Sequence, residues 1–455
     1  VYSAVIEREG RGEYLGQTVQ VVPHITDEIQ ARIAKAAVDV HPAKWKPDVC
    51  IIELGGTVGD MESAPFVEAL RQYRSKVGSD MCFVHVSLVP VLGSVGEQKT
   101  KPTQQSVRTL MGLGIAPDVL VCRSTAPLEL GVKKKLSAAC AIPPSRILSA
   151  HDVSNIYAAP GLLNQQHATE TLCEILQLPP PEPAWFGQQL ERWTPVPPAA
   201  DAPRLQVAIV GKYVGLLDSY LSIARAIGHA AHKLGVHADI EWVDAETLDA
   251  DNTTTLIPLL QSQCILVPGG FGDRGIEGKI LACATARAHK IPALGICLGM
   301  QTMLCEHWRS ELGVADAVIG EMDKGTPFLK DLGELRLGSH SVIVAGDVDS
   351  QYSKLHGGGG KVVNERHRHR YSLLSSEIRG SLQEVGVGVV GCEGEGVRHC
   401  AAVELGDHPF YVGVQYHPEF TSRPGAPGPL FVGLLQAGVG AGIGGGIGGG
   451  IGGGK

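Results

Sequence analysis

The chain has few charged residues, no long apolar run and no paired cysteine motif, and each shortage excludes a class of protein. Charged residues make up 19% of the 455 positions and the formal net charge is -8, which argues against a surface that binds nucleic acid. Outside the glycine-rich C-terminal residues, no run of about 18 apolar residues occurs, so we expect no membrane segment. The 11 cysteines are scattered without a Cys-x-x-Cys pair, which predicts no structural zinc and a reducing, cytoplasmic location.

Two parts of the chain alternate short apolar runs with helix-like stretches, a pattern typical of α/β sheets with buried parallel strands. The expected strands are 49–54, 82–91, 119–122 and 147–150 in the first part, and 205–210, 264–267, 291–294, 385–390 and 411–415 in the second. The proline-rich stretch between them predicts a stiff, extended linker. We therefore expect two doubly wound α/β domains at 1–178 and 205–436, a linker at 179–204, and a disordered Gly/Ile-rich tail at 437–455.

A cysteine nucleophile is indicated by Gly295-x-Cys297-x-Gly299, which follows an apolar run and precedes a helix-like stretch. This order of strand, sharp turn and helix is that of a nucleophile elbow, where glycines on both sides leave room for the tight turn. The start of the helix favours a thiolate on Cys297. His417 and Glu419 then supply a base and a carboxylate that orients it, whereas a buried structural cysteine would need neither.

A glycine-rich loop at 267–272 comes one strand before the elbow, and its backbone N–H groups suit an oxyanion. Taken alone, the loop could be a plain turn. Together with the elbow and the His-Pro-Glu sequence, it resembles the class I (triad) glutamine amidotransferase domain over residues 205–436. The resemblance implies that Cys297 attacks the glutamine carboxamide, with His417 as base and acid and Glu419 as its orienter. It also implies glutamine contacts at Gly270, Leu298, Gly299, Met300, Gln301, Glu321 and Arg370.

Arg370 ends an alternation of arginine and histidine that runs from Glu365 to Tyr371. This run could be a solvated charged strand, a metal site built from its histidines, or a recognition element. The interleaved arginines would repel a cation, which disfavours the metal site. The run also resembles a signature of the CTP synthase family, which favours recognition.

The first domain carries two motifs that resemble the same family. An acidic glycine loop at 55–63 follows the expected strand, at the edge where α/β sheets bind ligands, and Glu53 comes just before it. The stretch 96–104 gathers lysines and hydroxyls suited to a triphosphate, although alone it could be a solvated loop.

Members of the CTP synthase family aminate UTP to CTP, using ATP and ammonia from glutamine. The resemblance implies that Glu53 binds Mg²⁺ as a hard oxygen ligand. It implies UTP and CTP contacts at Asp60, Met61, Glu62, Lys99, Thr100, Lys101, Pro102, Thr103, Gln104 and Lys135, and ATP contacts at His151, Asp152 and Val153. GTP as activator, CTP as feedback inhibitor, and a homotetramer that can stack into filaments follow from the same resemblance.

The family opens with a strand and a lysine-bearing phosphate loop, whereas this chain begins at Val1 and contains no Gly-x-x-x-x-Gly-Lys-Ser/Thr. We therefore expect a P-loop NTPase-like synthetase domain that is N-terminally truncated. Two alternatives follow from this expectation. The chain could act only as a glutaminase, or it could be a non-catalytic subunit that senses CTP or takes part in assembly.

Overall fold

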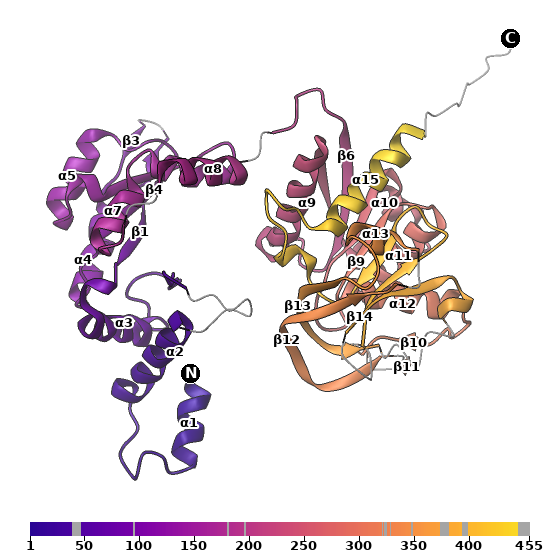
Figure 1. Cartoon of the computed structure of the whole chain (residues 1–455), viewed down its shortest axis with the longest axis horizontal. Helices are drawn as coiled ribbons and strands as arrows, with labels where there is room; N and C mark the ends of the chain where they lie inside the picture. The colour runs from indigo at the N-terminus through magenta and orange to yellow at the C-terminus, as the bar shows by residue number, and fades with distance from the viewer. Residues whose placement is uncertain are drawn as a thin grey trace. The chain divides into compact units, whose positions relative to one another are not determined.

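The computed structural model describes residues 1–38, 47–93, 96–179, 182–194, 197–320, 322, 325–327, 329–346, 349–373, 382–393 and 399–444. The chain divides into two compact units, Val1–Glu191 and Arg192–Lys455 (Figure 1). Among the described helices, none is both long and apolar enough to cross a membrane.

The first unit is built on a parallel sheet of three strands in the order β1-β4-β5. Leu120 of β4, Leu136 of α5 and Ile147 of β5 are fully buried in its core. The strands are β1 (Val84–Leu88), β4 (Val119–Ser124) and β5 (Ile147–His151), with a separate ribbon of β2 (Val91–Leu92) and β3 (Glu97–Gln98). The α-helices are α1 (Tyr2–Gly10), α2 (Thr26–Val38), α3 (Ala64–Val77), α4 (Lys101–Gly112), α5 (Leu130–Cys140), α6 (Ala159–Asn164), α7 (Ala168–Ile175) and α8 (Pro183–Trp193).

Three of the four strands expected in this unit are present, but the strand expected at 49–54 is absent from the structure. Its apolar side chains, Val49, Ile51, Ile52 and Leu54, are exposed. The edge strand β1 likewise exposes three apolar side chains. An apolar run predicts burial, but it becomes a strand only when a neighbouring strand takes up its backbone hydrogen bonds. Among the described residues, no strand pairs with this segment.

Two expectations about the segments outside the sheets are wrong. The proline-rich linker is not extended throughout, because α8 occupies Pro183–Trp193. The disordered Gly/Ile-rich tail was expected from 437, but helix α15 (Pro429–Gly444) includes residues 437–444. Tertiary packing explains this, because a Cβ at Gly438 would lie 2.4 Å from the Cys264 sulfur, so glycine lets the helix approach the sheet closely. The residues beyond 444 lie outside the described part of the chain.

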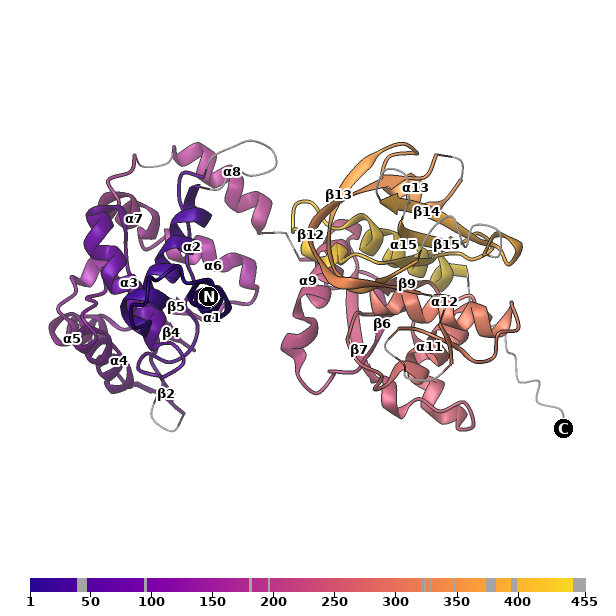
Figure 2. The ribbon, with the colours of Figure 1, turned by 90° about the horizontal axis from the view of Figure 1, so that it is seen from below.

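The second unit contains a sheet of nine strands in the order β13-β12-β14-β15-β16-β9-β8-β6-β7. Figure 2 shows the long, curved strands β12 and β13 of this sheet. Strands β16, β9, β8, β6 and β7 are parallel, and β13, β12, β14 and β15 extend the sheet with antiparallel pairings. The strands are β6 (Arg204–Gly211), β7 (His237–Asp244), β8 (Cys264–Val267), β9 (Ala293–Ile296), β12 (Lys330–Val344), β13 (Val362–Ser372), β14 (Val387–Glu393), β15 (His399–Leu405) and β16 (Tyr411–Val414), with β10 (Ala317–Val318) and β11 (Thr326–Pro327) in a separate pair.

Helices cover both faces of the parallel part, as expected for a doubly wound sheet. Val207 and Ile209 of β6 pack in one cluster with α9 and α15, while Ala208 and Val210 pack in another with α11. This alternation follows from the two-residue period of a strand. The helices of the unit are α9 (Leu221–Leu234), α10 (Ile257–Gln261), α11 (Ile276–Ala288), α12 (Leu298–Ser310), α13 (Gln351–Leu355) and α15. The adjacent carboxyl ends of β8, β9 and β16 carry the glycine loop, Cys297 and His417, so the fold brings the three motifs together.

Candidate active site

Cys297 stands at the turn between β9 and α12 and has the strained backbone of a nucleophile elbow, with φ +55° and ψ -106°. The flanking glycines are required by close packing. A Cβ at Gly295 would lie 2.7 Å from both the Gly299 backbone and the Met303 sulfur, and one at Gly299 would lie 1.9 Å from the Val267 carbonyl oxygen. The elbow predicted from the sequence is therefore present, and it places the thiol at the N-terminus of α12.

His417 lies between the thiol of Cys297 and the carboxylate of Glu419. Its Nδ1 is 2.8 Å from Glu419 Oε1, and the Glu419 side chain is buried. Burial alone would lower the pKa of His417, but its hydrogen bonds with Cys297 and Glu419 outweigh burial and raise the pKa to about 10. The three residues thus form a Cys-His-Glu triad in which a proton on the imidazole is stabilised from both sides.

The glycine loop after β8 lies against the triad. A Cβ at Gly269 would be 3.1 Å from His417 Cε1 and 3.5 Å from the Cys297 Cβ, so a side chain here would crowd the imidazole. Two buried lysines donate hydrogen bonds to carbonyl oxygens of this loop. Lys279 of α11 donates to the Pro268 carbonyl oxygen at 2.7 Å, and Lys212 donates to the Phe271 carbonyl oxygen at 2.8 Å. The sequence analysis missed both lysines, because only tertiary packing brings them to the loop.

A third residue that the sequence analysis missed, Gln415, connects the strand before His417 to the nucleophile. Gln415 donates through Nε2 to the Cys297 sulfur at 3.6 Å, and its Oε1 accepts from Gln301 at 3.1 Å. Gln415 and Gln301 are buried, and Met300 lies in the apolar core. In the sequence, the only hint of this contact is that a glutamine stands two positions before His417. The side chains of Gln301 and Met300, both expected to line the glutamine, are instead engaged inside the unit.

Strand β13 separates its arginines from its histidines. Arg366, Arg368 and Arg370 are exposed, whereas His367 and His369 are buried on the other face. Arg368 places its guanidinium over the Phe271 ring, 5.3 Å from the centroid, so this arginine face adjoins the glycine loop. Glu321, the other residue expected to hold the amino-acid end of glutamine, lies outside the described residues.

The backbone of β13 contacts the triad directly. The Arg368 carbonyl oxygen lies 3.7 Å from the Cys297 sulfur, and the His417 amide donates to the Arg366 carbonyl oxygen at 2.8 Å. Burial is the main cause that lowers the pKa of His369 to about 4 and the pKa of His367 even further, so both imidazoles are neutral at physiological pH.

In the first unit, Glu97 is paired with Lys99 and also feels the charge of Lys135. Lys99 Nζ is 2.5 Å from Glu97 Oε2, and this hydrogen bond, together with the charge of Lys135, lowers the pKa of Glu97. Lys101 and Pro102 are exposed at the start of α4, where unpaired N–H groups favour anions. Thr100, Thr103 and Gln104 are buried instead, and their side chains hydrogen-bond within the unit.

The residues expected to contact the CTP end of the nucleotide, and the expected Mg²⁺ ligand, lie at exposed positions. Asp60, Met61 and Glu62 are exposed in the turn before α3. Glu53 is exposed too, but it lies on the unpaired segment and not at a strand end as expected. Its free carboxylate is the hard oxygen donor that Mg²⁺ prefers, so the residue fits a magnesium ligand.

The predicted ATP contacts follow strand β5. His151 ends this strand, with Nδ1 3.1 Å from the Ser149 hydroxyl, and Val153 is half-buried. Asp152 forms an exposed ion pair with Arg123 at 2.8 Å.

The triad on an elbow, with a glycine loop beside it in a doubly wound sheet, defines a class I glutamine amidotransferase. A family profile described as "Glutamine amidotransferase class-I" matches residues 215–437, and one described as "CTP synthase N-terminus" matches residues 1–178. The chain is 45% identical to a CTP synthase of Dictyostelium discoideum, over 96% of this chain and 82% of that protein. It is 44% identical to CTP synthase 1-A of Xenopus laevis, over 97% of this chain and 77% of that protein. A solved structure of the Trypanosoma brucei CTPS glutaminase domain with bound acivicin is 31% identical, covering 52% of this chain and 94% of that one, with a TM-score of 0.49.

The chain belongs to the CTP synthase family. Its activity is that of a glutamine-hydrolysing ligase, which uses ATP to aminate UTP to CTP with ammonia taken from glutamine.

Proposed function

We propose that Cys297, His417 and Glu419 are the residues that release ammonia from glutamine. The arrangement of His417 between the thiol and a buried carboxylate carries this proposal. His417 holds the proton taken from the Cys297 thiol while the sulfur attacks the carboxamide carbon, and it then gives that proton to the departing ammonia. Water, deprotonated by His417, cleaves the glutamyl thioester to glutamate and restores the thiol. Glu419 holds the imidazole in the tautomer that both steps need.

The negative charge that develops on the carboxamide oxygen needs donors fixed in advance. The Leu298 amide is the first of α12, where backbone N–H groups have no partner inside the helix, and it directly follows the nucleophile. Gly270, whose loop lies against Leu298, supplies the second donor. Arg370, on the exposed face of β13, holds the glutamine carboxylate, and Glu321 holds the ammonium. Gly299, Met300 and Gln301 shape the pocket from the first turn of α12.

In the first unit we propose that Lys99, Lys101 and Lys135 bind the triphosphate of UTP or CTP. Lys99 is already paired with Glu97, and the charge of Lys135 also acts on that carboxylate, so a polyanion would compete with Glu97 for these cations. Asp60 and Glu62 contact the nucleotide from the turn before α3. His151, Asp152 and Val153 contact the adenine of ATP at the end of β5. Glu53 would hold Mg²⁺, which neutralises phosphate charge when it is bound.

Regulation and assembly belong to the same proposal, on the strength of the family relationship. GTP activates glutamine hydrolysis, CTP inhibits by occupying the UTP site, and four copies assemble, with filaments as a further state. All 11 cysteines are free thiols, which supports a cytoplasmic location.

The substitution Cys297→Ser tests the triad, with glutamate release and CTP formation measured separately. We expect glutamine-dependent activity of both kinds to be lost, while CTP formation from added ammonia and ATP is retained. The matched control is Cys173→Ser, a half-buried thiol in the first unit, which should leave every activity unchanged.

Two other results would replace this proposal. Glutamate release by the wild-type chain without CTP from either nitrogen source would identify it as a glutaminase alone. Binding of CTP with no turnover of glutamine or ammonia would identify a non-catalytic sensing or assembly subunit.

A further inference from the structure

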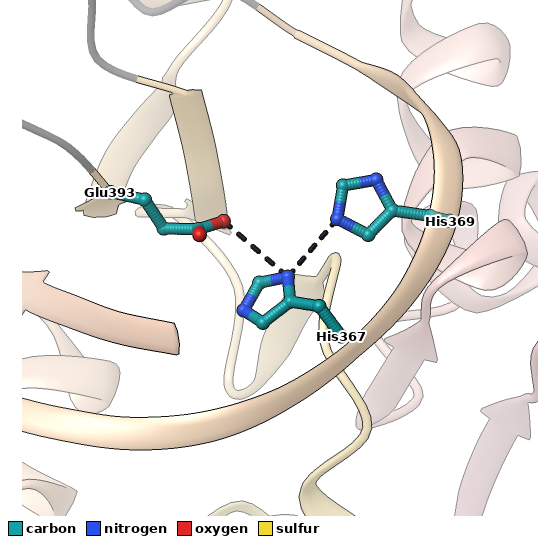
Figure 3. Close-up of side chains that lie close together, drawn as sticks. All are labelled: His367, His369 and Glu393. Carbon is teal, nitrogen blue, oxygen red and sulfur yellow. Dashed lines mark hydrogen bonds and ion pairs between the residues drawn. The ribbon is translucent and has the colours of Figure 1, made fainter. Parts of the chain in front are cut away.

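Three buried side chains meet on the side of β13 opposite its arginines. His367 Nδ1 lies 3.0 Å from His369 Nε2 and 3.4 Å from Glu393 Oε1 of β14 (Figure 3). The three ligand atoms lie within 4.8 Å of one another. Two ligands of a tetrahedral zinc ion, each at the usual bond length, are separated by about 3.3 Å. The spacing of these atoms is therefore close to that of a metal-binding set.

The outer hydrogen bonds of His369 and Glu393 leave one acceptor atom of each residue facing the centre of the cluster. His369 Nδ1 faces the Tyr371 carbonyl oxygen at 2.8 Å, which can only accept, so this nitrogen carries the proton and Nε2 presents a lone pair. Glu393 Oε2 accepts from Arg336 at 2.6 Å, whereas the buried Oε1 has no hydrogen-bond partner among the described residues. A lone pair and a free carboxylate oxygen thus converge on His367 Nδ1.

A single proton cannot satisfy this arrangement. If His367 carries its proton on Nδ1, that proton serves either His369 or Glu393 and leaves the other acceptor unmatched in a dry site. A dication satisfies all three atoms together. Two of the three residues already have partners of the kind that usually hold metal ligands, because a backbone carbonyl orients His369 and a guanidinium orients Glu393. Among the described residues, the outer nitrogen of His367, Nε2, has no such partner.

The interleaved arginines, which argued against a metal, do not oppose it here. The two-residue period of the strand places Arg366, Arg368 and Arg370 on the exposed face, opposite the histidines. Arg336 does reach the cluster, but it is bound to the far oxygen of the Glu393 carboxylate. The positive charge of Arg336 is therefore balanced by the Glu393 carboxylate, whose other oxygen faces the metal position.

We propose that His367, His369 and Glu393 bind a zinc ion, which links β13 to β14 across the intervening strand β12. Two histidines and one carboxylate form a known zinc ligand set, and a water molecule completes the tetrahedron. The ion fastens the strand whose carbonyls contact the Cys297 sulfur and the His417 amide. Zinc should therefore stabilise the second unit and hold the triad in place without touching substrate.

Cobalt binding tests the site, because Co²⁺ replaces Zn²⁺ and reports its ligands in the visible spectrum. The titration uses the full chain carrying Cys297→Ala, so that the nucleophile cannot compete. We expect one equivalent of Co²⁺ with ligand-field bands of a tetrahedral site and no thiolate charge-transfer band. Competition by Zn²⁺ should then remove these bands at one equivalent.

Ligand variants decide which residues hold the ion. Glu393→Gln keeps the shape and the contact with Arg336, and it should weaken Zn²⁺ binding at least as much as losing an outer contact does, roughly 10–100-fold. His369→Gln should do the same. The matched control is His408→Gln, a buried histidine bonded to the Ala286 carbonyl oxygen, which should bind as the parent does.

A second readout does not depend on the variants folding well. X-ray absorption of the zinc-loaded parent should show nitrogen and oxygen neighbours and no sulfur, and zinc should raise its melting temperature. Sulfur neighbours, unchanged affinity in both folded ligand variants, or no bound equivalent in the parent would each overturn the proposal.

Discussion

Lys279 offers a quantitative test of the packing beneath the glycine loop. Its side chain is fully buried, and burial is the main cause that lowers its pKa from 10.5 to about 7, with the charge of Lys212 adding to the effect. In the unfolded chain this lysine keeps its proton up to its usual pKa. Between about pH 7 and 10.5, the unfolded state therefore binds more protons than the folded state, and stability rises with pH. Below pH 7 Lys279 is protonated in both the folded and the unfolded state, so the free energy of unfolding carries the full cost of burying its charge and no longer changes with pH through this residue.

The magnitude follows from the width of that window. Each pH unit within it changes the unfolding free energy by about 1.4 kcal/mol, so two units change it by about 2.7 kcal/mol. Lys279→Met keeps the side-chain volume and removes the titration. The unfolding free energy of the variant minus that of the wild type should therefore increase by about 2.7 kcal/mol when the pH falls from about 9 to 7, and should level off below.

Urea denaturation of both proteins at several pH values measures this difference, in which the contributions of titrating groups that do not interact with Lys279 cancel. The absolute difference at one pH also contains the lost hydrogen bond to the Pro268 carbonyl oxygen, so only the slope carries the test. A flat difference would mean that Lys279 does not titrate in this window. A slope of the opposite sign would mean that the folded state holds the proton more tightly than the unfolded state, which contradicts the burial argument.

Three further predictions concern other parts of the site. Glu419→Gln should lower kcat for glutamine by about 10²–10⁴ with little change in KM, measured by glutamate release; an unchanged kcat would remove Glu419 from the triad. Gly299→Ala should destabilise the second unit by at least about 1–3 kcal/mol in urea unfolding, because its Cβ would overlap the Val267 carbonyl oxygen. Gly228→Ala, on a helix with open space around it, should stabilise by about 0.5–1 kcal/mol and serves as the matched control. Lys99→Ala should raise KM for UTP and leave glutamine hydrolysis unchanged, and a parallel loss of both would refute separate sites.

The sequence predicted four of the five parallel strands of the second unit, because buried parallel strands are continuous apolar runs with clear ends. The fifth, β7, was not predicted, since its side chains are mostly only partly buried and it has no continuous apolar run. Strand β8 begins and ends where its apolar run does. The elbow was predictable for a related reason, since glycines flank a reactive residue between a strand and a helix. By contrast, the 15-residue strand β12 shows mixed burial along its length and gave no comparable signal.

The failures come from features that depend on partners distant in the chain. The run at 49–54 has the composition of a strand, but composition does not say whether a neighbour is there to pair with it. Lys279 looked like an ordinary polar residue of a helix, because nothing local shows that α11 is packed on nearly all sides. Glu393 and His367 are 26 positions apart, and only the path of β13 and β14 brings them together.

Strand β13 carries arginines on one face and histidines on the other, and its backbone contacts the triad. Its odd-numbered positions 367 and 369 face the interior as neutral imidazoles, and its even-numbered positions 366, 368 and 370 face outward as fixed cations. A side chain that attracts a carboxylate and one that can bind a dication are thus kept on opposite faces of a strand. The backbone between them contacts the nucleophile and the base. Any change in the packing of the buried face must therefore reach the triad through those carbonyls, whereas a change on the arginine face should alter glutamine affinity first.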